Sequence, residues 1–348
     1  MNDEKKNGKV SADPSNFRQM ILEFPKQFRV GFELGKEVSL SGEFSSIEIS
    51  GMGGSALPGN LLRVYLSDHY RRFNGKPPIA IYQNRSYGLP HEAYRPGCLN
   101  FLCSYSGNTE ETVASFEEAI AHGLPSVGIS AGGKIEALCE KHGVPHISLP
   151  IPFENFQPRV GTGYFFGAIF GVLVKLGMAS DTCDALTLQA ERLLEEMPGL
   201  EARGKELAEK VAGKTPVVYA NPRYKSVAMI WKIKINENAK TPAFWNFFPE
   251  LNHNEMVGFT KPQGEFLLFL LRDAEDHPQN LKRFEVTSQI LGERGIASEI
   301  IDMGEGSVFT KIFRTILLGD WMSYHLALRY GVDPTPVDMV EELKKRLV

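Results

Sequence analysis

The sequence predicts an α/β protein in which doubly wound, mostly parallel sheets are flanked by helices. Short apolar runs recur at helix-sized intervals between amphipathic segments, which is the pattern of parallel strands joined by crossover helices. Glycine- and hydroxyl-rich turns follow two of these runs, as ligand-binding turns do at the carboxyl edge of such sheets. With 348 residues, 43% of them hydrophobic and 23% charged, the chain is long enough for about two domains.

The first predicted unit contains five strands and the helices between them. Amphipathic segments at residues 61–70 and 111–122 supply two crossover helices. We place this unit at residues 41–180, behind an N-terminal extension and helix at residues 1–40. Its strands are expected at residues 47–50, 79–83, 99–103, 126–129 and 147–149.

A second unit of similar plan is expected at residues 181–348. A charged helical region at residues 182–211 leads into it. The similarity of the two halves is what a divergent duplication would produce, but no repeated motif marks one. The expected strands lie at residues 216–220, 266–271 and 297–301, and the expected helices at 278–294, 309–330 and 337–347.

Composition narrows the function classes. The net charge is −4 and the isoelectric point is near 6.1, so nothing indicates a surface for nucleic acid or anionic membrane. The longest apolar run, residues 163–177, is interrupted by Lys175 and is too short for a confident membrane span. The polar residues before Phe17 lack the apolar stretch of a secretory signal. We therefore expect a cytoplasmic protein without a nucleic-acid or membrane partner.

Cysteine and histidine patterns indicate neither a disulfide nor a metal site. The eight histidines form no HExxH motif, and the four cysteines form no CxxC pair. The cysteines fall mostly within apolar patterns, so we expect buried, reduced thiols. We expect chemistry that uses no metal and no cofactor. The four cysteines are Cys98, Cys103, Cys139 and Cys183.

A turn rich in hydroxyls follows the strand predicted at residues 99–103. It reads Ser-Tyr-Ser-Gly-Asn-Thr, and its last residue, Thr109, opens the next predicted helix. Backbone N–H groups at a helix N-terminus attract anions, and the hydroxyls of Ser104, Ser106 and Thr109 can add further donors. The turn therefore predicts a site for a phosphorylated small molecule.

A second glycine-rich turn follows the first predicted strand. Its Gly-Met-Gly-Gly-Ser-Ala sequence fits the G-x-G-x-x-A dinucleotide pattern, but the next strand ends in Tyr-Gln-Asn, where an acidic ribose ligand would stand. Alternatively, Gly53 and Gly54 let the backbone approach a ligand, while Ser55 caps a helix that begins near residue 57. Turns of this kind face one shared crevice, so the two can grip a single sugar phosphate. A purely structural role for both turns stays open.

Five sequence features together resemble those of the bifunctional phosphoglucose/phosphomannose isomerases of the sugar isomerase (SIS) fold. The features are GMGGS at residues 51–55, SYSGNTEET at 104–112, Pro158-Arg159, Asn236-Glu237 and ELNHNE at 250–255. The SxSGNT turn alone identifies only a SIS domain, and some SIS domains are regulators or synthases, whereas its combination with Asn236-Glu237 and ELNHNE is much more specific. The resemblance covers nearly the whole chain. It implies two SIS domains and an enzyme that interconverts glucose 6-phosphate or mannose 6-phosphate with fructose 6-phosphate through an enediol.

The resemblance also implies roles for individual residues. Glu237 matches the glutamate that moves a proton between the sugar carbons C1 and C2, a task suited to a carboxylate base. Arg159 resembles the arginine that stabilises the negative enediolate. The residues implied to line the phosphate pocket are Gly53, Gly54, Ser55, Ser104, Ser106 and Thr109.

Further roles concern ring opening and epimer choice. Moving a proton during ring opening suits a histidine, and His253 is the candidate; in this family the corresponding histidine comes from the neighbouring subunit of a dimer. Lys344 resembles the family lysine that approaches the ring oxygen, although Lys345 is adjacent. Thr335 is a possible match to the threonine that the family associates with mannose phosphate activity. Each of these residues also has an ordinary alternative as a surface or loop side chain.

Two other functions compete with the isomerase hypothesis. A non-catalytic SIS domain can sense a sugar phosphate for a regulator, but no basic helix-turn-helix segment precedes the first unit. An aminosugar-phosphate isomerase or deaminase is also conceivable, although no N-terminal cysteine nucleophile for a glutaminase precedes the fold. The absence of GxxxxGK[ST] disfavours an ATP-dependent kinase.

Overall fold

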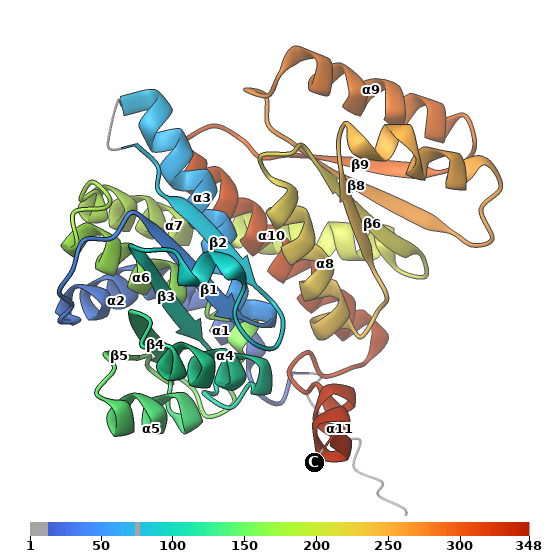
Figure 1. Ribbon diagram of the computed structural model, residues 1–348. Coiled ribbons are helices and arrows are strands. Elements are labelled where there is room, and N and C mark those ends of the chain that lie inside the picture. The colour runs from blue at the N-terminus through green and yellow to red at the C-terminus, as the bar shows by residue number, and fades with distance from the viewer. Residues whose placement is uncertain (1–12, 74–76, 348) are drawn as a thin grey trace, which may run out of the picture.

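Two parallel sheets organise the computed structural model, which describes residues 13–73 and 77–347 (Figure 1). Within these residues the first sheet has five strands in the order β2-β1-β3-β4-β5, all parallel. Strand order reverses between β1 and β3, which creates the crevice where ligands bind in open α/β sheets. The strands are β1 (Ser46–Gly51), β2 (Ala80–Asn84), β3 (Cys98–Cys103), β4 (Ser126–Ser130) and β5 (His146–Ser148).

Helices cover both faces of this sheet, as a parallel sheet requires. Side chains of α4 and α5 form a small apolar cluster with Leu102 on one face, and α2, α3 and α6 belong to the main core on the other face. The helices are α1 (Phe17–Leu22), α2 (Phe24–Glu37), α3 (Gly53–Phe73), α4 (Glu110–Ala121), α5 (Gly133–His142) and α6 (Thr162–Lys175), with short 3-10 turns η1 (His91–Tyr94) and η2 (Pro158–Val160).

The apolar run at residues 163–177 is the core helix α6. Its first twelve residues are all buried, and glycines on α2 and α6 bring the two helix backbones into direct contact, because a Cβ at Gly35 would collide with the carbonyl of Ala168. Burial on every side explains why this helix lacks an amphipathic pattern. Among the described residues, no helix is both long and apolar enough to cross a membrane.

The second sheet repeats the first plan with four described strands, in the order β7-β6-β8-β9, again all parallel. Its elements are α7 (Cys183–Val211), β6 (Thr215–Ala220), α8 (Lys225–Ala239), β7 (Phe244–Phe247), η3 (Glu250–His253), η4 (Glu255–Thr260), β8 (Phe266–Arg272), α9 (Pro278–Gly292), β9 (Ala297–Asp302), α10 (Val308–Tyr330) and α11 (Asp338–Leu347).

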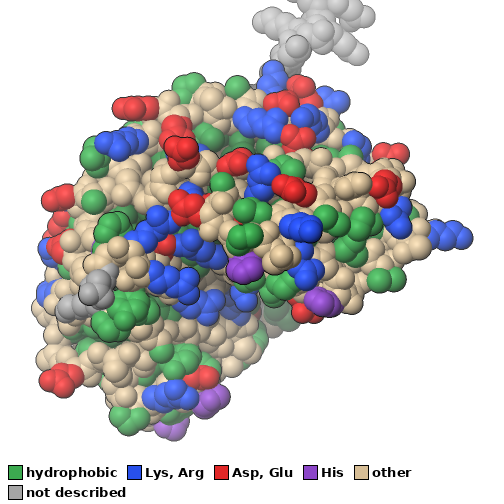
Figure 2. Space-filling view, turned by 90° about the horizontal axis from the view of Figure 1, so that it is seen from above, with side chains coloured by type: hydrophobic (Ala, Val, Ile, Leu, Met, Phe, Trp, Pro, Cys, Tyr) green, Lys and Arg blue, Asp and Glu red, His purple; other side chains and the backbone are tan. Residues whose placement is uncertain are grey.

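Long helices join the two sheets. Figure 1 shows α10 and α8 between them, and the main apolar cluster is continuous from α2 and α6 to side chains of α7, α8 and α10. The last helix, α11, lies at the bottom of Figure 1 away from both sheets and has no buried residue. On the face seen from above, acidic and basic side chains are mixed (Figure 2).

The predicted fold class and the predicted strands are confirmed, with ends that shift by one residue or so. The short edge strand β7 was not predicted from the sequence. The prediction that a helix begins near residue 57 with Ser55 as its cap is wrong, because α3 begins at Gly53. All four cysteines are buried and free, as expected. The two sheets lie on either side of residue 180, but the proposed domain limits remain a prediction, and residues 1–12, for which we expect no secretory signal, lie outside the described part.

Candidate active site

The hydroxyl-rich turn leaves β3 at the centre of the first sheet and enters α4. Thr109 is the residue before the helix, as predicted, but its hydroxyl bonds the Ser104 Oγ at 2.9 Å instead of capping the helix. Gly107 adopts φ +69°, and a Cβ there would collide with the carbonyl of Gly132, so only glycine fits this position. The turn is therefore held in one shape by its own hydroxyl pair and by the loop after β4.

The glycine-rich turn after β1 lies beside the first turn. The Ser55 Oγ accepts a hydrogen bond of 3.1 Å from the backbone N–H of Tyr105, which joins the two turns. Gly54 packs so tightly that an added Cβ would lie 2.8 Å from the Pro158 carbonyl oxygen and 3.0 Å from the Arg159 Cα. The two turns and the segment carrying Arg159 thus form one continuous surface.

Exposure divides five of the six predicted phosphate residues into two groups, and the sixth, Gly54, is buried. Gly53 and Ser106 are exposed, and Thr109 is half-buried, so a ligand can reach them. Ser55 and Ser104 are buried, and their hydroxyls are engaged with the turns themselves. The buried members give the exposed ones a fixed position.

Glu237 and Arg159 form an ion pair although they lie 78 residues apart. Glu237 is in the last turn of α8, and its Oε2 lies 3.2 Å from the Arg159 Nη1. The Arg159 side chain is 2% exposed, whereas the Glu237 side chain is 33% exposed. This arrangement leaves a carboxylate accessible beside a fixed positive charge.

Four further groups hold the guanidinium of Arg159. Its Nε donates to the Asn238 Oδ1 at 2.6 Å, and its Nη1 donates to the Gln157 Oε1 at 2.7 Å. Its Nη2 donates to the carbonyls of Pro334 at 2.7 Å and Thr335 at 3.0 Å. Burial lowers the pKa of Arg159 from its ordinary value, and the Glu237 charge opposes that shift. The guanidinium remains charged because its ordinary pKa is so high.

A buried ion pair supports Arg159 from behind. The Lys234 Nζ lies 2.6 Å from the Asp320 Oδ1 and donates to the Arg159 carbonyl at 2.7 Å. Burial lowers the pKa of Lys234 and raises that of Asp320, and each shift is opposed by the partner's charge. The pair connects α8 and α10 directly to the backbone of the site.

His253 and Lys344 lie elsewhere in the chain. His253 ends η3 beside the edge strand β7, is exposed, and its ring has no hydrogen-bond or ion-pair partner among the described residues. Lys344 is exposed on α11, where its Nζ bonds the Glu341 Oε1 at 2.7 Å. Within the described part of one chain, neither residue contacts Glu237 or Arg159.

Thr335 lies next to the ion pair. Its carbonyl accepts from Arg159, and its hydroxyl is buried without a hydrogen-bond partner in the described part of the chain. The backbone of Thr335 therefore helps to hold the guanidinium of Arg159.

Known proteins show strong similarity to this chain over almost its full length. A curated relative from Caldicellulosiruptor bescii, a bifunctional phosphoglucose/phosphomannose isomerase, is 36% identical over 94% of this chain and 98% of its own. This chain belongs to the bifunctional phosphoglucose/phosphomannose isomerase family. A relative of the same name from Aquifex aeolicus is 35% identical over 87% of this chain and 91% of its own.

Other comparisons agree with this family. Residues 200–347 match the bacterial phospho-glucose isomerase C-terminal SIS domain. Among solved structures, a putative phosphosugar isomerase from Clostridium difficile 630 has the same fold, with a TM-score of 0.69, 14% identity, and coverage of 94% of this chain and 97% of that one.

The motifs of the isomerase family led to Glu237 and Arg159 but not to the residues around them. Asn238 and Lys240 directly follow Glu237 in the sequence Asn-Glu-Asn-Ala-Lys, and both bond parts of the site. Their position at the end of an apolar helical segment was a usable signal. No sequence signal marked the Lys234–Asp320 pair, because its members lie 86 residues apart and each looks like an ordinary helix residue.

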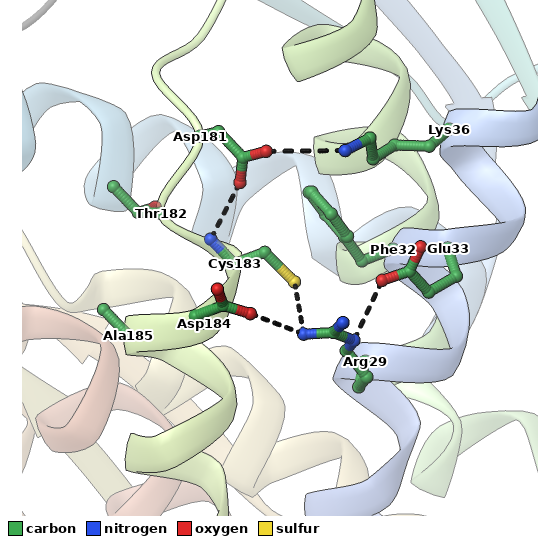
Figure 3. A pocket seen from close by; sticks show the side chains of 9 residues that line it. All are labelled: Arg29, Phe32, Glu33, Lys36, Asp181, Thr182, Cys183, Asp184 and Ala185. Atoms are coloured by element: carbon green, nitrogen blue, oxygen red, sulfur yellow. Dashed lines mark hydrogen bonds and ion pairs between the residues drawn. The ribbon is translucent and has the colours of Figure 1, made fainter.

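A separate cavity of about 430 Å³ lies between α2 and the start of α7 (Figure 3). Its cations are already paired: Arg29 bonds Glu33 and Asp184, and Lys36 bonds Asp181. These pairs leave no free positive charge for a phosphate. This cavity is therefore a poorer candidate for a phosphate site than the two turns.

Proposed function

We propose that this protein interconverts glucose 6-phosphate and mannose 6-phosphate with fructose 6-phosphate. Family membership supports the reaction, and the observation that carries the mechanism is the accessible Glu237 carboxylate held 3.2 Å from a buried arginine beside two anion-binding turns. We place the enzyme in the cytoplasm, where its four free, buried cysteines would stay reduced.

The phosphate group of the sugar binds at the two turns. Ser106, Thr109 and the backbone N–H groups that begin α4 provide donors, and the exposed Gly53 lets the sugar approach the backbone. Ser55, Ser104 and Gly54 keep the turns against each other and against Arg159. Because phosphate is remote from the reacting carbons, its binding energy orients C1 and C2 toward Glu237.

Glu237 acts as the base. Its carboxylate removes the proton from C2 of the open-chain aldose, and the electrons of that C–H bond form the C1–C2 double bond of an enediolate. The protonated Glu237 returns the proton to C1, while the O2 hydroxyl proton passes to O1, which yields the ketose. Arg159 offers a fixed positive charge to the enediolate oxygen, and its five hydrogen-bonding partners prevent it from moving away.

Ring opening uses His253 from a second copy of the chain. His253 is exposed beside β7, at the edge of its sheet, and Phe244 and Val257 near it are 55% and 71% exposed. An open strand edge with apolar neighbours fits an interface between subunits of a homodimer. Lys344 on α11 assists at the ring oxygen.

Epimer choice depends on the space around C1 and C2. Accepting both aldoses requires that the C1–C2 bond of the open chain rotate, so that either face meets the same base. Thr335 has a small side chain and its carbonyl accepts a hydrogen bond from Arg159, so it is our candidate for the residue that permits this rotation.

A direct assay tests the reaction. Purified protein is incubated with fructose 6-phosphate, and both aldose phosphates are separated and quantified over time. Formation of both supports the proposal. Binding of the sugar phosphate without turnover would instead identify a sensor, and ammonia release from glucosamine 6-phosphate would identify a deaminase.

A further inference from the structure

Lys240 stands in a backbone conformation that its residue type disfavours. It follows the last residue of α8 with φ 53° and ψ 34°, in the left-handed region. A residue with a Cβ costs roughly 1 kcal/mol more than glycine there, and helices usually place glycine or asparagine at this position. We therefore expect the side chain of Lys240 to form contacts that offset the cost of this backbone conformation.

The side chain of Lys240 turns back onto the site. Its Nζ donates to the Glu237 carbonyl at 2.5 Å and to the Pro334 carbonyl at 3.0 Å. The Pro334 carbonyl also accepts from the Arg159 Nη2 at 2.7 Å. One carbonyl therefore joins the two cations, and Lys240 connects it to the backbone of Glu237.

The hydrogen bonds of the Lys240 ammonium form a bridge between the Glu237 and Pro334 carbonyls. This bridge fixes the relative position of the Glu237 carboxylate and the Arg159 guanidinium. The last turn of α8 carries the Glu237 carboxylate, and its C-terminal carbonyls lack intrahelical partners, so the ammonium stabilises the turn that holds the carboxylate. The Pro334–Thr335 segment, held by the same ammonium and by Arg159, leads into α11.

We propose that Lys240 is a positioning residue of the isomerase. It keeps the Glu237 carboxylate and the Arg159 guanidinium at a fixed distance and orientation relative to each other. The inference rests on the proposed function and adds to it a residue that does not touch the substrate. The left-handed conformation is the cost of directing this side chain back to the site.

The charge of Lys240 makes the bridge sensitive to pH. The charged groups around its ammonium are Arg159 on η2, Glu237 on α8, Asp333 before α11 and Asp338 on α11. Loss of hydration, and then repulsion from Arg159, lower the pKa of Lys240 to about 8, although the residue is largely exposed. As the pH rises through this value the ammonium loses its proton and its hydrogen bonds weaken, so kcat falls on the alkaline side.

Lys240→Gly separates positioning from folding. Glycine removes the side chain and relieves the left-handed strain, so we expect a melting temperature at or above that of the wild type. We expect kcat to fall about tenfold or more with KM within twofold, because the phosphate turns are untouched. Lys232→Met is the matched control and should keep wild-type kcat, because Lys232 lies on the same helix and its side chain forms no hydrogen bond or ion pair with the described residues.

Lys240→Arg tests the charge. Arginine stays protonated, so this variant should recover part of the lost kcat and lose the alkaline fall near pH 8. A Lys240→Gly enzyme with wild-type kcat, or a Lys240→Arg enzyme with an unchanged pH profile, overturns the inference while leaving the isomerase proposal intact. A wild-type protein that forms neither aldose phosphate overturns both.

Discussion

At the scale of single residues, the proposed mechanism depends on the guanidinium of Arg159, which is held in a fixed position. Arg159 donates to five acceptors from separate parts of the chain, which include Gln157, Asn238 and Glu237. A group held in this way needs no rearrangement when negative charge develops on the substrate. The same bonds mean that charge alone does not replace it.

Arg159→Lys should therefore be a severe change. Lysine keeps the charge but cannot reproduce the planar guanidinium, so the Thr335 carbonyl would lose its donor and the Pro334 carbonyl would keep only Lys240. We expect kcat to fall about 10²-fold, with a lower melting temperature. Steady-state kinetics and thermal unfolding check this, with the exposed Arg192→Lys on α7 as the control. A kcat within threefold of wild type would remove Arg159 from the mechanism.

Helices and turns set the distances between these residues. Gly54 shows this most clearly, because it brings the glycine-rich turn into contact with the backbone of Arg159. A Cβ there would lie 2.8 Å from a carbonyl oxygen, so either the turn or the arginine segment would have to shift.

Gly54→Ala should lower kcat/KM about 10²-fold, because it displaces the phosphate turn relative to Glu237. Gly199→Ala is the control: Gly199 lies in α7, an added Cβ meets nothing within 4 Å, and alanine should stabilise the helix by about 0.5–1 kcal/mol. Kinetics and urea unfolding of both variants make the comparison. Equal activity of the two variants would contradict the close packing of turn and arginine.

The buried pair of α8 and α10 gives a stability prediction. Lys234→Met leaves Asp320 buried without its partner, and we expect the free energy of unfolding to fall by about 3–5 kcal/mol. In Lys234→Met/Asp320→Leu neither charge of this pair remains, so part of the loss should return. Urea unfolding measures both, and a loss below about 1 kcal/mol for the single variant would show that Asp320 takes a proton at little cost.

Most elements could be predicted because their sequence pattern and their burial agree. Strand β3, for example, is buried at every residue and reads as an apolar run. Strand β7 is short, partly exposed and at an edge, so its Phe-Trp-Asn-Phe sequence gave too weak a signal. The start of α3 was misplaced because Gly53 and Gly54 read as a loop, whereas both belong to the first turn of the helix, where Gly54 packs against Pro158 and Arg159.

At the scale of the whole molecule, the two halves share a plan but not a site. Where the first sheet has hydroxyls after β3, the second has Asp273 after β8, bonded to Lys311 at 2.7 Å and to the Tyr224 hydroxyl at 2.8 Å. Ion pairs of Asp68 with Arg223 and of Arg72 with Glu275 connect α3 to this place. The charged side chains that follow β8 thus pair with other residues of the second unit and with α3 of the first unit. The sequence showed both units but not this pairing, because it depends on residues far apart.

Our proposal also requires a second copy of the chain to complete the active site. If His253 comes from the partner, a Glu237→Gln chain and a His253→Ala chain have complementary defects. Mixing the two inactive proteins after unfolding and refolding them together should restore about a quarter of wild-type activity, since half the dimers are mixed and each has one intact site. Activity measured against mixing ratio checks this. No recovery in verified mixed dimers would place His253 in its own subunit's site or outside the mechanism.

The central claim is that Glu237 carries the proton between C1 and C2. Wild type, Glu237→Gln and the exposed control Glu195→Gln are each added to fructose 6-phosphate in deuterated water with a chelator, and the sugars are followed by NMR. We expect wild type and the control to form glucose and mannose 6-phosphates with deuterium at C2, and Glu237→Gln to be slower by about 10²- to 10⁴-fold while still folded. Wild-type rates of deuterium incorporation in Glu237→Gln would contradict the account.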